Sequence, residues 1–166
     1  MLDEVDRIIA AWEAESPGVD TEPLAVLSRV SRLARHLDLA RRRCFAAHGL
    51  EVWEFDVLAA LRREGAPYEL SPGDLIHQTL SSSGTMTNRI DRLAERGLVE
   101  RSTNPADRRS VRVRLTPAGA ETVGAALDDL IAYERGVLEA LTPLTRRQVA
   151  ASLRTLLIRF ETPGDT

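Results

Sequence analysis

Arginine side chains are concentrated in one short stretch of this 166-residue chain. Between Arg89 and Arg114 there are eight arginines and four acidic residues, so this stretch has a formal charge of +4, although the whole chain has a charge of −3. The arginines are residues 89, 92, 96, 101, 108, 109, 112 and 114. A guanidinium stays charged at all physiological pH values, and its planar fork of donors fits phosphate and carboxylate groups. A basic stripe on an otherwise acidic chain is typical of a protein that binds nucleic acid.

A row of short polar side chains lies at the start of this stretch. Apolar residues at Met86, Ile90 and Leu93 predict a helix that begins at Ser81 or Ser82 and ends at Gly97. Short hydroxyl and amide side chains can approach base edges in a major groove, and a helix N-terminus also favours phosphate. The alternative is that the serines and threonines only cap the helix. We expect the following residues of this helix to contact DNA: Ser82, Ser83, Thr85, Thr87, Asn88 and Arg92.

The neighbouring segments predict a winged helix-turn-helix. The sequence Ser71-Pro72-Gly73-Asp74 is a helix start, and the short helix that it opens ends near His77, a few residues before the next one. Residues 98–103 and 110–115 follow a period of two around a turn at 104–107, which predicts a β-hairpin. Arg108 and Arg109 lie at its tip, where a guanidinium can enter a narrow minor groove. The sequence does not say which of the two enters.

The remaining segments predict helices before and after this lobe. Apolar residues recur at helical spacing over residues 2–16, 24–49, 51–63 and 117–141, and Thr145 with Gln148 predicts a capping box for a last helix ending near Phe160. The terminal helices have wide apolar stripes but no large body to cover. We therefore expect them to intertwine with those of a second copy in a twofold dimer. The predicted fold class is mainly α with a small β-hairpin wing.

The segment NRIDRLAERGLVERSTNPADRRSVRVRLTPAG resembles the multiple-antibiotic-resistance regulator (MarR) family of bacterial winged-helix transcription factors. The resemblance extends from about Leu24 to Phe160, and the wing sequence Asp107-Arg108-Arg109 is a specific part of it. It implies one MarR-type domain over residues 1–166, with an N-terminal extension helix at 1–18, dimerisation helices at 24–64 and 117–161, and a winged helix-turn-helix lobe at 68–116. It also implies that one wing arginine pairs with Asp107.

The N-terminal extension and four particular residues are similar to the urate-responsive branch of that family. The resemblance implies that Trp12, Asp56, Arg89 and Arg101 surround a small anionic ligand. Urate is the first choice, xanthine or another purine the second, and a carboxylate or phenolic anion the third. An indole offers a flat apolar surface to a purine, and Arg89 supplies paired donors for an oxyanion. Two alternatives remain: Trp12 is a core residue, or Asp56 is a buried acid whose structural partner is Arg89.

These residues suggest how a ligand acts on DNA binding. Arg89 lies at the edge of the apolar stripe of its helix, so its head is expected to point toward the protein body. An anion that binds Arg89 and is repelled by Asp56 would move the DNA-reading helix and spoil the spacing that a palindromic operator requires. The chain is thus expected to be a repressor that releases double-stranded DNA when the ligand binds.

Other functions have less support in the sequence. Cys44 follows three arginines, which is compatible with a redox-sensing repressor, but it lies on the apolar stripe of its helix. A ligand-independent DNA-binding protein is a further alternative. There is no nucleophile motif, phosphate-binding glycine loop or metal-ligand spacing, so no enzyme activity, cofactor or metal is expected. With no signal peptide and no apolar run long enough for a membrane span, a cytoplasmic location is expected.

Overall fold

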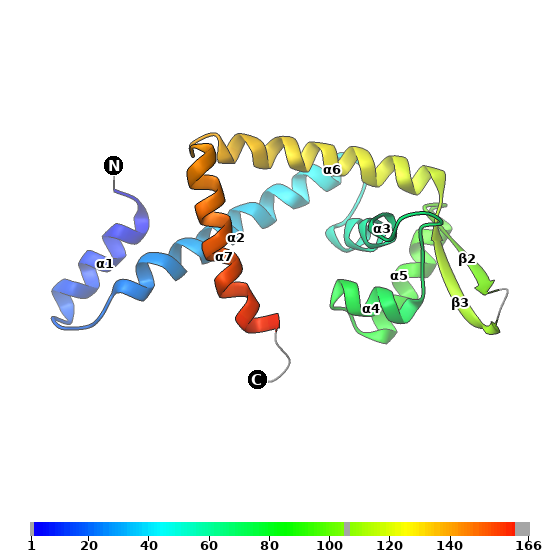
Figure 1. Ribbon diagram of the computed structural model, residues 1–166, viewed down its shortest axis with the longest axis horizontal. Helices are drawn as coiled ribbons and strands as arrows, with labels where there is room; N and C mark the ends of the chain where they lie inside the picture. The colour runs from blue at the N-terminus through cyan, green and yellow to red at the C-terminus, as the bar shows by residue number, and fades with distance from the viewer. Residues whose placement is uncertain (1, 105–106, 162–166) are drawn as a thin grey trace. The chain divides into compact units, whose positions relative to one another are not determined.

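The computed structural model describes residues 2–104 and 107–161, with the side chains of residues 103–110 left outside the description (Figure 1). Two compact units make up the chain, Met1–Ala126 and Leu127–Thr166. The first holds five helices and a small sheet among the described residues, together with the start of α6, and the second holds the rest of α6 and α7. The mainly helical fold with a small β wing is confirmed.

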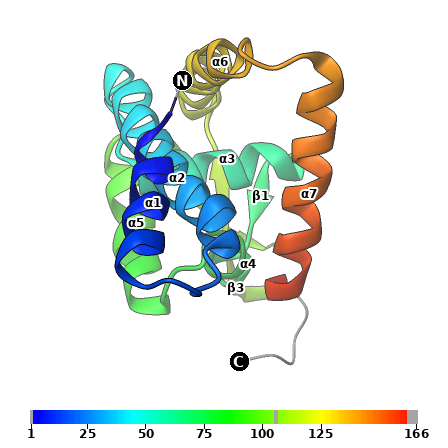
Figure 2. The same ribbon diagram turned by 90° about the vertical axis from the view of Figure 1, so that its left-hand side faces the viewer.

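Helices α1 (Glu4–Glu15) and α2 (Glu22–Ala47) open the first unit and pack against each other (Figure 2). Asp3 caps α1, since its side chain accepts a hydrogen bond from the backbone of Asp6. Arg29 of α2 binds the Asp3 carboxylate, with 2.8 Å between Nε and Oδ2. The extension helix is therefore docked on the N-terminal part of α2. Its position leaves the C-terminal part of α2 free of α1.

Helix α3 (Val52–Glu64) forms the centre of the first unit. Leu58 and Leu61 are fully buried, and Phe55 stacks on Phe45 of α2 with 3.9 Å between the ring centroids. Arg62 extends from the same helix and donates to the backbone oxygen of Ala120 in α6, at 2.6 Å. This helix is the body against which the neighbouring elements are positioned.

The predicted winged helix-turn-helix is present in this unit. Helix α4 (Pro72–Thr79) is followed after a short turn by α5 (Ser83–Glu95), and strands β2 (Val99–Asn104) and β3 (Asp107–Leu115) form the hairpin. A further strand, β1 (Glu69–Leu70), pairs with β3 and gives the sheet order β1-β3-β2. Strand β1 could not be predicted from the sequence, because a two-residue strand is too short to show a period.

Helix α6 (Pro117–Leu138) begins directly after the wing, and α7 (Pro143–Glu161) ends the described chain. A side chain at Gly119 would overlap the backbone oxygen of Leu98, so the glycine lets the first turn of α6 lie against the end of the α5–β2 connection. The expectation that Thr145 caps the last helix is wrong. The helix begins at Pro143, and the Thr142 hydroxyl accepts a hydrogen bond from the Thr145 backbone at 3.2 Å.

Two features are absent from the residues that the structure describes. Over residues 2–104 and 107–161, no helix combines the length and the apolar character needed to cross a lipid bilayer. In the same ranges, no three His, Cys, Asp or Glu side chains gather as they would around a metal ion.

Candidate nucleic-acid interface and adjoining cleft

Helix α5 has one face fixed against the protein and one face exposed. Met86, Ile90 and Leu93 are 0%, 1% and 0% exposed, as their spacing predicts. The turn before α5 is made by Leu80, which adopts a left-handed conformation at φ 51°, and by Ser82, which is extended at the N-cap. This arrangement leaves the N-terminal half of α5 open to a partner.

The exposed N-terminal half of α5 presents hydroxyl and amide groups. The side chains of Ser82 and Thr85 share a hydrogen bond of 2.8 Å, and the Thr87 hydroxyl lies 3.4 Å from the backbone oxygen of Ser83. Such groups can donate to and accept from base edges, and the unpaired backbone N–H groups of a helix N-terminus attract phosphate. The residues predicted to contact DNA that are exposed here are Ser82, Ser83, Thr85, Thr87 and Asn88.

Arg89, Arg92 and Arg96 lie one to two turns apart along another edge of α5. Their side chains are directed at α3 and the residues just before it. Arg92 pairs with Glu51 at 2.7 Å. Arg96 pairs with Glu54 at 2.7 Å and also donates to the backbone oxygen of Gly49 at 2.9 Å. Glu54 is only 2% exposed, so this is a nearly buried carboxylate with one guanidinium as its ionic partner. Arg92, predicted to contact DNA, is thus held by the protein body but remains exposed.

Two further arginines of the basic stretch are also paired within the chain. Arg101 binds Asp91 and Arg114 binds Glu69, at 2.7 Å and 2.6 Å. Arg108 and Arg109 belong to β3, but their side chains lie outside the described residues. Their predicted contact with a minor groove, and the pairing of one of them with Asp107, therefore stay predictions.

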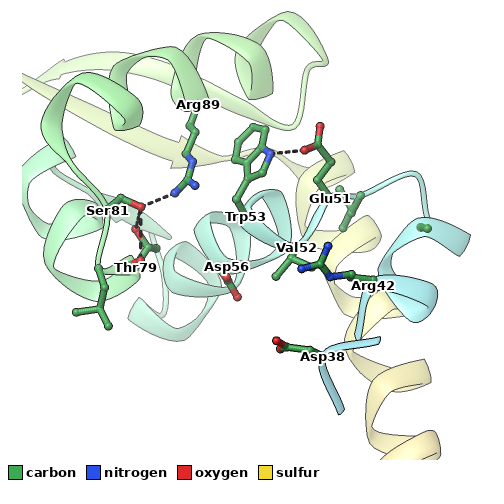
Figure 3. A pocket seen from close by; sticks show the side chains of 12 residues that line it. Asp38, Arg42, Glu51, Val52, Trp53, Asp56, Thr79, Ser81 and Arg89 are labelled. Carbon is green, nitrogen blue, oxygen red and sulfur yellow. Dashed lines mark hydrogen bonds between the residues drawn. The ribbon is translucent and has the colours of Figure 1, made fainter. Parts of the chain in front are cut away.

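A cleft of about 630 Å³ lies beside α5 in the same unit (Figure 3). Helix α2 contributes Asp38 and Arg42, helix α3 contributes Trp53 and Asp56, and α5 contributes Arg89. With Glu51, which also lines it, the cleft has an aromatic side chain together with three carboxylates and two guanidiniums. A planar molecule with negative charge could stack on the ring and pair with a guanidinium at the same time.

Trp53 is held on several sides. Its Nε1 donates to Glu51 at 2.8 Å, and Figure 3 shows its indole ring between Glu51 and Arg89. The guanidinium carbons of Arg89 and Arg92 lie 5.3 Å and 4.9 Å from the centroid of the indole ring, within the range of cation–π attraction. Arg89 also donates to the hydroxyl of Ser81. The hydrogen bond from Trp53, followed by that from Arg92, lowers the pKa of the Glu51 carboxyl below its ordinary value.

Of the four residues that the resemblance assigns to a ligand, the structure brings two to the cleft. Asp56 and Arg89 both line it, and Arg89 points toward the protein body as expected. Asp56 pairs with Arg41 at 3.0 Å, rather than with Arg89. Arg101 is on β2 with its guanidinium on Asp91.

Trp12 is on α1 and is 51% exposed, so it is not a core residue of this unit. The reason it lies away from the cleft is the length of α2. Helix α1 binds α2 near Arg29, whereas the cleft uses Arg42, thirteen residues or about 20 Å further along the helix.

Three residues of the cleft were not predicted from the sequence: Trp53, Ser81 and Glu51. Trp53 lies three positions before Asp56, which places both on one face of α3. This spacing from Asp56 is the feature of the sequence from which Trp53 could have been predicted. Cys44, the proposed redox residue, is a half-buried free thiol in α2.

Comparison with known proteins identifies the group to which this arrangement belongs. The sequence model of the MarR family matches residues 48–110. The chain is 35% identical over 158 residues to the transcriptional regulator PecS of Dickeya dadantii, which covers 95% of this chain and 93% of PecS. The chain belongs to the MarR family. A second relative is the transcriptional repressor NicR of Pseudomonas putida, 33% identical over 128 residues, which covers 75% of this chain and 77% of NicR.

The fold is also similar to that of a solved DNA-binding protein. BpsR of Bordetella bronchiseptica superposes with a TM-score of 0.68 at 27% identity, over 90% of this chain and 100% of BpsR, and its DNA binding is regulated by 6-hydroxynicotinic acid. The chain is therefore a DNA-binding transcriptional regulator of the MarR family, and the relatives that it matches are regulators rather than enzymes.

Proposed function

We propose that this MarR-family protein is a dimeric repressor that releases a palindromic operator when a small planar anion binds beside α5. The observation that carries this proposal is the position of Arg89, which belongs to the DNA-reading helix and also lines the cleft with Trp53 and Asp56. One side chain therefore belongs to both the ligand cleft and the DNA-binding element. Arg89 and Asp56 are the residues that we place against the ligand.

The charges of the cleft give the direction of the effect. An anion is attracted by Arg89 and repelled by Asp56, so its binding favours a changed position of α5 relative to α3. Two reading helices in a dimer must fit successive turns of the duplex, about 34–36 Å apart. A ligand that alters this separation weakens DNA binding, and a coupling of this kind is typically worth about 1–3 kcal/mol.

The dimer is supported by apolar side chains that each unit leaves exposed. In the second unit, the exposed apolar residues of α7 include Leu144, Leu157, Ile158 and Phe160. In the first unit, α2 exposes an apolar row that includes Leu27. Exposed apolar side chains in such numbers are typical of an interface, and a second copy of the chain offers the same side chains in return.

Urate is our first choice of ligand, followed by xanthine or another purine. The third choice, a carboxylate or phenolic anion, is supported by the 6-hydroxynicotinic acid that regulates BpsR. All of these molecules are planar and carry or readily acquire negative charge. The cleft suits this shared chemistry because it combines the Trp53 ring with the guanidinium of Arg89.

To test this, labelled DNA from upstream of the protein's own gene is titrated with the protein, and binding is measured by fluorescence polarisation. The titration is done with and without urate, xanthine or 6-hydroxynicotinate. We expect urate to weaken DNA binding by about 5–150-fold in the wild type, and Arg89→Ala to reduce this response to less than about twofold. The control is Arg43→Ala, which removes an exposed guanidinium of α2 that does not line the cleft. Identical ligand titrations for the wild type and Arg89→Ala would refute the assignment.

A further inference from the structure

Helix α5 is attached to α3 in two different ways at its two ends. At its C-terminal end, Arg96 binds the nearly buried Glu54 and the backbone of Gly49, and none of these groups lines the cleft. Nearer its N-terminal end, Arg89 is held by Ser81 and by the Trp53 ring, and all three line the cleft. A molecule in the cleft can therefore reach only the attachment near the DNA-reading end.

Trp53 connects the two arginines that are nearest to that end. Its ring is in contact with Arg89, which lines the cleft, and with Arg92, which does not. Glu51 accepts hydrogen bonds from both the Trp53 indole and Arg92, and Arg92 also contacts the Trp53 ring. Each of these three side chains therefore contacts the other two. A shift of the indole ring disturbs both arginines together, although only one of them is within reach of a ligand.

From this arrangement we propose that Trp53 is the positioning residue through which an anion in the cleft acts on α5. The inference rests on the proposed function and specifies how that site is regulated. A planar anion that stacks on Trp53 and pairs with Arg89 replaces the contact between the ring and the guanidinium. The contact that joins Arg89 of α5 to α3 is then lost, while Arg96 and Glu54 keep the C-terminal end of the helix in place. The helix pivots about that fixed end.

Each contact that the ligand displaces has a modest effect. A cation–π contact at a partly exposed site changes an equilibrium constant by about 2–5-fold. Two arginines share the same ring, so their combined loss corresponds to about 4–25-fold, which lies within the range expected for the coupling between ligand and DNA. The contacts of Trp53 are therefore strong enough to account for the response.

The first test measures coupling separately from ligand affinity. Operator affinity is determined in the absence of ligand and at saturating urate for the wild type, Trp53→Leu and Trp53→Phe, and urate affinity is determined for each by thermal shift. We expect the ratio of the two operator dissociation constants to fall to less than about twofold in Trp53→Leu, with urate still bound. Trp53→Phe keeps a ring face but lacks the donor to Glu51, and we expect it to keep part of the response.

The second test uses the fact that the chain has two tryptophans, Trp12 and Trp53. The variant Trp12→Phe leaves Trp53 as the sole indole, and Trp53→Phe leaves Trp12. Because urate absorbs light equally in both samples, each variant corrects the other for that artefact. We expect a saturable change in the emission of Trp53, with the same midpoint as the loss of DNA binding.

The outcomes separate the two proposals. If the wild type releases its operator with urate and Trp53→Leu does so to the same extent, the role of Trp53 is overturned but the proposed function stands. If the emission of Trp53 shows no saturable change while DNA is released, the role of Trp53 is likewise overturned. If the wild type binds DNA and responds to none of the three probes, the ligand-responsive function fails, and the inference fails with it.

Discussion

Removal of the Arg96 side chain is expected to destabilise the protein much more than removal of Arg92, although both lie on the same face of α5. Arg96→Ala leaves Glu54, 2% exposed, without its ionic partner and also removes the donor to Gly49. Breaking a fully buried ion pair costs about 3–5 kcal/mol. Arg96 itself is 40% exposed, so water reaches part of the vacated site, and we expect a loss of about 2–3 kcal/mol.

The matched control is Arg92→Ala. Arg92 and Glu51 are both more than half exposed, and such pairs contribute about 0–1 kcal/mol. Urea unfolding followed by circular dichroism, at one protein concentration because a dimer is expected, should show a midpoint lowered by roughly 1 M in Arg96→Ala. The midpoint for Arg92→Ala should move by less than half as much.

A double variant tests the reason for the loss. In Arg96→Ala with Glu54→Gln, the unpaired charge is replaced by a neutral amide that can still accept the hydrogen bond from the Glu51 backbone. We expect this variant to regain at least about 1 kcal/mol relative to Arg96→Ala alone. Equal losses for Arg96→Ala and Arg92→Ala, or no recovery in the double variant, would contradict the view that a nearly buried charge anchors this end of α5.

Two further predictions concern the wing and the extension helix. Arg108→Ala and Arg109→Ala should each weaken operator binding, and at least one should reduce the slope of log affinity against log salt by about 1, whereas Arg114→Ala on the same strand should leave the slope unchanged. The pairing with Arg29 lowers the pKa of Asp3 to about 2 from its ordinary value of 3.8, so this pairing stabilises the fold above about pH 4 and is lost as the pH falls toward 2. Carboxyl NMR titration should show the Asp3 pKa rising toward 3.8 in Arg29→Ala, and an unchanged value would exclude this contact in solution.

Local signals in the sequence were sufficient for most of the fold. The helix start at Ser71 and the left-handed Gly97 are set by residues within a few positions of one another, and both occur as expected. At Thr142 and Thr145, two hydroxyls competed for one helix start. Proline at the first helical position favoured the earlier one.

The cleft could be predicted only in part, because its contacts are long-range. Arg92 and Glu51 are 41 positions apart, and Arg96 and Glu54 are 42 positions apart. At such separations, the spacing of residues in the sequence does not show which acidic side chain will pair with a given arginine. The count of positive charges between Arg89 and Arg114 was correct, but it did not reveal that several of these charges are neutralised by acids elsewhere in the same unit.

On α5, the residues that hold the helix in place differ from those that face outward. This difference matters for changing the DNA sequence that the protein prefers. The arginines of this helix hold it in place, while its outward side chains at Ser83, Thr85 and Asn88 have little part in the packing. These outward positions can therefore be varied in a library without loss of the scaffold. Selection on altered half-sites would then yield repressors that recognise new sequences and still respond to the original effector.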